Sequence, residues 1–260
     1  MRWLISRAVA FAYRNLLINL KNFFAFMELL FWPVVGIISI GIMASFLKLD
    51  TKYLYFLLTG AIIAGVLQVS QLDVAYGLLF DVWSKSVKQT FIAPVKIYDV
   101  IIGSWIMGVG RGILSFVLLY FISKWGFGFK LPGAFNVIAS MTGVYLSALI
   151  VGMCVMIFIF LFGQRIDIIA WMISVIMMLI CGIYYPVTYL PDMLVKIASV
   201  IPLTYFIEYF RTGYGFELTF TNPLIKGYLL SAAYAIILYI ILNFAYLRAK
   251  RTGMILKLSE

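Results

Sequence analysis

Long apolar runs, several of them the length of a membrane-spanning helix, constrain this chain more than any other feature of its sequence. A helix needs ~20 apolar residues to cross the hydrocarbon core of a bilayer. Hydrophobic residues make up 65% of the chain and charged residues only 12%, which favours a multi-pass membrane protein over a soluble one. We therefore expect an all-α integral membrane fold with six transmembrane helices within residues 23–247. The expected spans cover residues 23–46, 53–80, 98–123, 134–162, 168–185 and 227–247.

Residues 1–22 differ from the spans because they combine apolar side chains with a basic stripe. Arg7, Arg14 and Lys21 recur at heptad spacing and so share one face of a helix. This pattern is typical of an amphipathic helix that lies flat on a membrane surface. The alternative is that these residues only begin the first span on its cytosolic side.

The distribution of basic residues predicts the orientation of the chain. With both termini in the cytosol, 12 Lys and Arg fall on inner segments, 7 on outer segments and Arg111 within the membrane, which accounts for all 20. Basic residues are enriched on the cytosolic side, so we expect a protein of the cell membrane with a cytosolic basic tail, residues 248–260. Because the cations gather beside the spans, the net charge of +10 indicates contact with membrane lipids rather than with nucleic acid.

The connection between the fifth and sixth spans, residues 186–215, is too apolar for an ordinary loop and too interrupted for a span. Pro191 and Pro202 should each open a helix of roughly a dozen residues, about half the length of a span. We expect a re-entrant helical hairpin at the outer surface. Glu208 and Arg211 lie one turn apart, where they can form a buried ion pair or simply a solubilising pair at the surface.

Tyrosines crowd the same region, and Tyr184 and Tyr185 lie just before it. Tyrosine is typical of the interface between membrane and water. The alternative is that these rings line an exit that passes sugars or aromatic compounds.

Two charged residues are expected inside the spans, Asp73 in the second and Arg111 in the third. Charges at this depth are expensive and often functional. One interpretation is an internal ion pair or snorkelling to polar loops, and the other is a role in a transport pathway. The second interpretation supports an alternative function, a secondary transporter driven by an ion gradient through Asp73 and Arg111.

Residues 81–95 form the most polar stretch of the chain interior. A short helix from roughly residue 82 to residue 92, broken before Pro94, fits this stretch. It is either a basic loop held by lipid headgroups or a helix on which a cytosolic partner docks.

The sequence contains no set of residues that indicates an enzyme. It has no histidine, and no GxxxxGK[ST] loop that would cradle the phosphates of ATP. We therefore expect no catalytic residue, no metal site and no cofactor in this chain. If transport is powered, the energy must come from another subunit, which would bind the ATP and magnesium, or from an ion gradient.

Two stretches resemble the membrane-spanning permeases of type-2 ATP-binding-cassette exporters, a family that exports drugs, lipids and polysaccharides. Residues 181–215, CGIYYPVTYLPDMLVKIASVIPLTYFIEYFRTGYG, follow the family's pattern of Gly, aromatic, Pro, then Leu-Pro, an apolar helix, Pro-Leu-Thr and a closing Arg. Residues 81–95, DVWSKSVKQTFIAPV, are similar to the coupling helix and its closing Ala-Pro-Val. Many members carry an acidic-Gly-Thr signature in that helix, where this chain has Lys85-Ser86-Val87-Lys88-Gln89.

The resemblance implies a half-transporter in which two permease chains pair and two separate ATPase subunits dock on the coupling helices. It also implies an amphipathic elbow helix at residues 1–22 and a re-entrant cap at the outer end of the pathway. The residues implied in ATPase coupling are Asp81, Trp83, Lys85, Lys88, Gln89 and Pro94. The residues implied in the outer cap are Tyr184, Tyr185, Pro186, Pro191, Pro202, Thr204, Glu208 and Arg211. A further alternative is a membrane scaffold that transports nothing.

Overall fold

The chain folds into α-helices, as its sequence predicts. A computed structural model describes residues 2–21, 23–92, 95–163 and 167–252, and this part of the chain contains helices and connecting turns but no β-strand. The helices are α1 (Arg2–Lys21), α2 (Phe23–Phe46), α3 (Thr51–Trp83), α4 (Val87–Ile92), α5 (Ile97–Phe127), α6 (Ala134–Phe162), α7 (Asp167–Ile180), the 3-10 helix η1 (Val187–Tyr189), α8 (Asp192–Ala198), α9 (Pro202–Thr212) and α10 (Pro223–Arg251).

Four helices in the described part of the chain are long and apolar enough to cross a membrane, namely α3, α5, α6 and α10. The pair α8 and α9, bent by 90° at its break, would add a fifth if it formed one broken span. Shorter apolar helices occupy Leu30–Phe46 within α2 and Ile168–Ile180 within α7. These helices make the chain a multi-pass membrane protein. The six expected spans therefore correspond to four long candidates and two shorter apolar helices.

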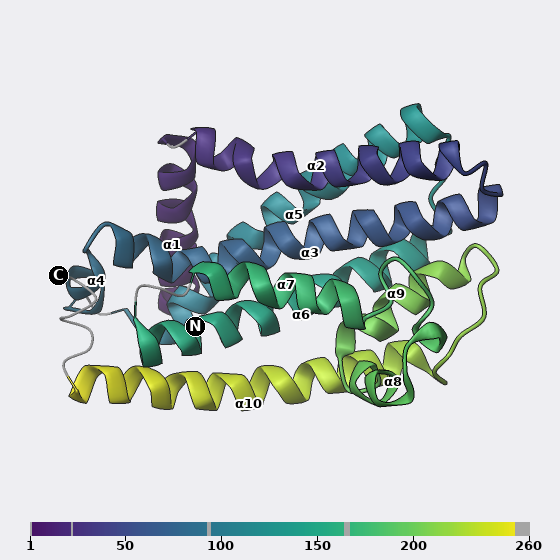
Figure 1. Cartoon of the computed structure of the whole chain (residues 1–260). Helices are drawn as coiled ribbons and strands as arrows, with labels where there is room; N and C mark the ends of the chain where they lie inside the picture. The colour runs from purple at the N-terminus through teal and green to yellow at the C-terminus, as the bar shows by residue number, and fades with distance from the viewer. Residues whose placement is uncertain (1, 22, 93–94, 164–166, 253–260) are drawn as a thin grey trace.

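The long helices run side by side, and α1 runs across them (Figure 1). Helix α3 is the centre of the bundle, because it packs against α2, α5, α6 and α7, and its residues 58–67 are all buried. The short helix α4 lies at one end of the bundle, and α8 and α9 lie at the other (Figure 1). We call these the α4 end and the α9 end.

Prolines set the starts of the short helices, as the sequence predicts. Pro191 is the N-cap residue of α8, and Pro202 is the first residue of α9. Proline suits these positions because a first-turn N–H has no partner within the helix. After α7, Gly182 has a φ of +70°, which favours glycine and turns the chain toward η1.

Candidate functional site

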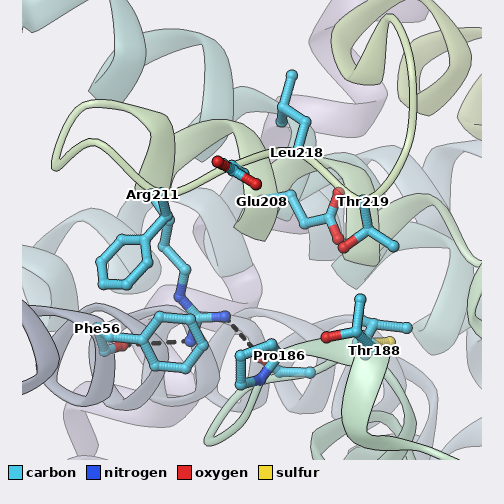
Figure 2. Close-up of a pocket in the computed structure, with 12 residues that line it drawn as sticks. Phe56, Pro186, Thr188, Glu208, Arg211, Leu218 and Thr219 are labelled. Atoms are coloured by element: carbon cyan, nitrogen blue, oxygen red, sulfur yellow. Dashed lines mark hydrogen bonds between the residues drawn. The ribbon is translucent and has the colours of Figure 1, made fainter.

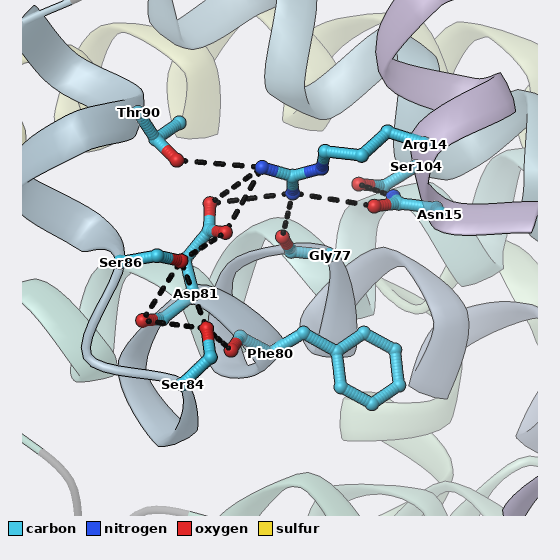
Figure 3. Close-up of polar contacts among 9 residues, drawn as sticks. All are labelled: Arg14, Asn15, Gly77, Phe80, Asp81, Ser84, Ser86, Thr90 and Ser104. Carbon is cyan, nitrogen blue, oxygen red and sulfur yellow. Dashed lines mark hydrogen bonds and ion pairs between the residues drawn. The ribbon is translucent and has the colours of Figure 1, made fainter. Parts of the chain in front are cut away.

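At the α4 end, Arg14 of α1 joins three helices (Figure 3). Its Nη1 donates hydrogen bonds to Asp81 Oδ1 of α3 at 2.9 Å and to Thr90 Oγ1 of α4 at 3.3 Å. Its Nη2 donates to Asp81 Oδ2 at 3.3 Å, so the guanidinium and the carboxylate form a two-pronged ion pair. The Asp81 side chain is 4% exposed and the Arg14 side chain 33% exposed. We call Arg14, Asp81, Ser86 and Thr90 the Arg14 cluster.

Asp81 also fixes the turn between α3 and α4. The Ser86 hydroxyl donates to Asp81 Oδ1 at 3.0 Å, and the Ser86 N–H donates to the Asp81 carbonyl at 2.8 Å. Lys85 adopts a φ of +57° within this turn. The sequence places Asp81 among residues that a partner would contact, but the structure buries it, so it can act on a partner only by positioning α4.

The other described residues predicted for coupling are displayed at the surface. Trp83, Lys85, Lys88 and Gln89 are all exposed, while Pro94 lies outside the described residues. Together they give the segment at the α4 end a basic surface with one large aromatic side chain. A partner with acidic side chains could bind this surface through the lysines and bury Trp83 at the contact.

The basic stripe of α1 faces α3 and α5 at two of its three positions, which differs from the expected contact with a membrane surface. Besides the Arg14–Asp81 pair, Arg7 Nε lies 3.6 Å from Asp99 Oδ2, and Arg7 Nη2 donates to the Tyr98 hydroxyl at 3.0 Å. Only Lys21 of the stripe is exposed. The carboxylates that attract the stripe lie far along the chain, so helical periodicity alone could not find them.

Two asparagines extend the contact of α1 into the bundle. Asn15 Nδ2 donates to Ser104 Oγ at 3.3 Å, and Asn19 Oδ1 accepts a hydrogen bond from Arg111 Nη1 at 3.3 Å. Both asparagines are 2% exposed. Sequence reasoning missed them, although two amides one helical turn apart beside a basic stripe indicate a polar face that needs partners.

Asp73 and Arg111 form a buried ion pair, with Arg111 Nη1 at 2.5 Å from Asp73 Oδ1. Both residues are 3% exposed. The structure shows the internal ion pair that the sequence offers as one interpretation. The arginine side chain of α5 reaches the carboxylate of α3, and each charge compensates the other.

At the α9 end, the Arg211 side chain is held by backbone carbonyl groups (Figure 2). Nη1 donates to the Gly182 carbonyl at 2.6 Å, and Nη2 donates to the Ile183 carbonyl and to the Phe56 carbonyl at 3.2 Å. The guanidinium also lies 3.4 Å from the centre of the Phe56 ring, a cation–π contact. Arg211 is 4% exposed. We call Arg211, Phe56, Gly182 and Ile183 the Arg211 cage.

The expected ion pair between Glu208 and Arg211 is not formed. The two side chains point apart in Figure 2, and Glu208 Oε2 accepts a hydrogen bond from the Phe220 N–H at 3.3 Å. None of the three ion pairs given above involves Glu208 or Arg211. The turn after α7 offers carbonyl groups without helical partners, and these take the guanidinium in place of the carboxylate.

A cavity of about 270 Å³ lies beside the Arg211 cage. Its walls come from the turn after α7, from α9 and from the segment before α10, so it contains charged and apolar groups together (Figure 2). The lining residues that Figure 2 labels are Phe56, Pro186, Thr188, Glu208, Arg211, Leu218 and Thr219.

The remaining residues predicted for the outer cap are spread over this end. Tyr185 donates through its hydroxyl to the Leu179 carbonyl near the end of α7. Tyr184 is exposed, and Thr204 is fully buried in α9. Only Pro186, Glu208 and Arg211 of the predicted set line the cavity.

Long side chains tie the connections of the α9 end together. Lys52 Nζ donates to the Gly215 carbonyl at 2.9 Å, and the Tyr214 hydroxyl donates to the Lys130 carbonyl at 2.7 Å. The Tyr214 hydroxyl is protonated at neutral pH, and because burial raises its pKa it also remains a donor in alkaline solution. These bonds hold the segment after α9 against the start of α3 and against the turn that precedes α6.

Comparison with known families agrees with a multi-pass membrane protein. Residues 12–214 match the family model described as ABC-2 type transporter. The chain therefore belongs to the ABC-2 type transporter family. Membership makes it a component of membrane transport that is not itself catalytic, and permeases of this family work with ATP-binding-cassette partners in general.

A stretch of the chain is also similar to an uncharacterised protein of Archaeoglobus fulgidus. The two are 48% identical over 48 residues, which are 18% of this chain and 75% of that protein.

Proposed function

We propose that the chain is the membrane-spanning subunit of an exporter that moves a hydrophobic, amphipathic or lipid-linked substrate out of the cell. The substrate class is a drug, a lipid or a polysaccharide. Two copies pair in the cell membrane, each with six spans and cytosolic termini, and two separate ATPase subunits bind the ATP and magnesium. The match of residues 12–214 to the ABC-2 type transporter family is the observation that carries this proposal.

The ATPase subunits dock on the exposed surface at the α4 end. Lys85 and Lys88 are exposed there beside Trp83, and α4 is joined to the rest of the bundle through the Arg14 cluster. A partner that pushes on α4 therefore acts on α1 and α3 as well. In the proposed orientation this end faces the cytosol, where ATP is available.

The α9 end closes the outer side of the pathway. The 90° bend between α8 and α9 and the Arg211 cage support a fixed re-entrant cap rather than a fully crossing helix. The cavity at this end has apolar residues such as Phe56, Phe216 and Leu218 among its lining, which suits a substrate with an apolar portion.

The alternative function, secondary transport through Asp73 and Arg111, predicts ion-dependent uptake by the purified chain without ATP. The pairing of these two charges with each other supports a structural role for them. A non-transporting scaffold predicts that a partner ATPase keeps the same rate with and without substrate.

The proposal is tested by co-expressing the chain with the ATP-binding-cassette ATPase encoded beside its gene. We expect a stable complex and, in inside-out vesicles, ATP-dependent accumulation of a fluorescent phospholipid or an aromatic dye. Absence of both the complex and ATP-dependent transport would overturn the proposal.

A pair of matched variants tests where the ATPase docks. Lys85→Glu with Lys88→Glu reverses two charges at the α4 end and should abolish the complex. Lys48→Glu with Lys130→Glu reverses two exposed charges at the α9 end and should leave the complex intact. The control is matched in backbone as well, because Lys48 and Lys85 both have positive φ, +49° and +57°. Equal loss of the complex in both variants would contradict docking on α4.

A further inference from the structure

Helix α4 has six residues, too few to be stable by itself, so its position depends on the groups that hold it. Val87 is fully buried, and the turn before it is fixed by the hydrogen bonds between Ser86 and Asp81. The Thr90 hydroxyl, which accepts from Arg14 Nη1 at 3.3 Å, links α4 to α1 (Figure 3).

Helix α1 carries this contact onward into the bundle. Asn15, next to Arg14 in sequence, donates to Ser104 of α5, and Asn19 one turn later accepts from Arg111. A continuous set of polar contacts therefore leads from α4 through α1 to the buried Asp73–Arg111 pair.

We propose that Arg14 is a positioning residue that makes α1 move together with α4. A displacement of α4 passes through the Thr90–Arg14 bond to α1, and from Asn19 of α1 to the buried pair. This inference rests on the proposed function, because it takes α4 as the segment on which the ATPase acts. In this proposal α1 transmits the movement of α4 to the bundle, a role beyond that of anchoring the chain at the membrane surface.

The geometry separates the two contacts of Arg14. Its ion pair with Asp81 has a shortest distance of 2.9 Å and joins α1 to α3, whereas the hydrogen bond to Thr90 is 3.3 Å long and joins α1 to α4. A change at Thr90 thus removes the direct link from Arg14 to α4, while the Arg14–Asp81 ion pair and the Ser86–Asp81 bonds stay in place. Valine has nearly the shape of threonine without the hydroxyl, so Thr90→Val is the discriminating variant.

The test follows amide hydrogen exchange in the complex of the full chain with its ATPase, with and without ATP and vanadate. In the wild-type complex, we expect nucleotide to change exchange in residues 87–92 and in residues 9–20. In Thr90→Val and Arg14→Gln, the change in residues 87–92 should remain and the change in residues 9–20 should be lost. Without nucleotide, the equilibrium constant for local opening of residues 9–20 should rise by roughly tenfold in Arg14→Gln. A factor of this size corresponds to the loss of one hydrogen bond to a charged group.

Two controls keep the result specific. Thr90→Ser retains a hydroxyl and should restore the response of residues 9–20. Lys21→Gln alters the exposed member of the same basic stripe and should respond like the wild type. A response of residues 9–20 that persists in Thr90→Val and in Arg14→Gln would overturn the inference while leaving the proposed function intact. A wild-type chain that forms no complex would instead overturn the proposed function, and the inference with it.

Discussion

Arg14 and Arg211 lie at opposite ends of the bundle and have their charges compensated in different ways. Arg211 is almost fully buried and donates to three backbone carbonyl groups, with no carboxylate in its cage. Arg14 is one-third exposed and donates mainly to side chains, those of Asp81 and Thr90. Backbone acceptors are fixed by the fold, whereas side-chain acceptors can rotate and exchange with water. The comparison indicates a rigid α9 end and an α4 end whose contacts can break and reform.

The largest expected effect comes from breaking the rigid end with Arg211→Leu. This change leaves three carbonyl groups without their donors, and each hydrogen bond to a charged group contributes about 1.5–3 kcal/mol. We expect a loss on the order of 5 kcal/mol in the free energy of unfolding. Denaturant unfolding in detergent micelles measures it.

Two further variants sharpen this prediction. Arg211→Lys keeps the charge but lacks the planar fork of donors, so it should recover only part of the loss. The double exchange Glu208→Arg with Arg211→Glu should not rescue stability, because a carboxylate at position 211 would face carbonyl oxygens. Rescue by the double exchange would show that the two residues pair after all.

The middle of the bundle offers a third arrangement, the fully buried Asp73–Arg111 pair. Asp73→Leu leaves the buried guanidinium uncompensated and should lower the free energy of unfolding by about 3–5 kcal/mol. The double variant Asp73→Leu with Arg111→Met removes both charges and should be closer to the wild type. A double variant as unstable as the single one would show that Arg111 depends on partners other than Asp73.

Gly60→Ala tests how closely α3 approaches the Arg211 cage. A Cβ at this position would lie 1.9 Å from the Ile183 carbonyl oxygen and 2.9 Å from Arg211 Nη2. Because the obstructing atom belongs to the backbone of Ile183, the turn after α7 must shift. We expect a loss of about 1–3 kcal/mol in the free energy of unfolding. Gly36→Ala in α2, with nothing within 4 Å of the added atom, is the control. Similar melting temperatures for the two variants would contradict a rigid α9 end.

Asp81→Asn tests the α4 end and should have a smaller effect than Arg211→Leu. The amide keeps the shape and one acceptor, and water can reach the one-third exposed Arg14 side chain. We expect a loss of about 1–2 kcal/mol, with faster hydrogen exchange in residues 87–92. A loss as large as that of Arg211→Leu would remove the difference between the two ends.

The smallest expected effect is that of Glu208→Gln. Glu208 is partly exposed, and its carboxylate accepts a hydrogen bond from a backbone N–H. The amide oxygen of glutamine can accept the same hydrogen bond. The free energy of unfolding should change by less than about 0.5 kcal/mol. A large loss of free energy of unfolding in the same micelle measurement would be evidence for the Glu208–Arg211 ion pair that the sequence suggests.

The sequence predicts the local features of both ends well. Apolar length predicts the extent of α5 and α6 to within a few residues, and Pro191 and Pro202 locate the starts of α8 and α9. These features depend on residues that are close in the chain. The ends of α3 and α10 extend beyond the expected spans because polar residues there still favour a helix.

The partners of the arginines could not be predicted in the same way. Arg14 and Asp81 are 67 positions apart, and nothing in the spacing of either helix indicates that they meet. The acceptors of Arg211 are backbone carbonyl groups, which every residue has and which no side-chain pattern reveals. Neighbouring charges such as Glu208 and Arg211 suggest a pair in the sequence, yet packing directs them to different groups.

The central position of α3 also has a consequence for how the protein is made. This helix contributes Asp73 to the bundle, and the arginine that compensates it lies 38 residues later in the chain. During synthesis, α3 therefore reaches the bilayer before its counter-charge has left the ribosome, and a lone carboxylate at that depth is unfavourable in lipid. Pairing with Arg111 of α5 removes this cost, so α5 stabilises the inserted α3. Variants at Arg111 should accordingly reduce the amount of inserted protein as well as the stability of what is inserted.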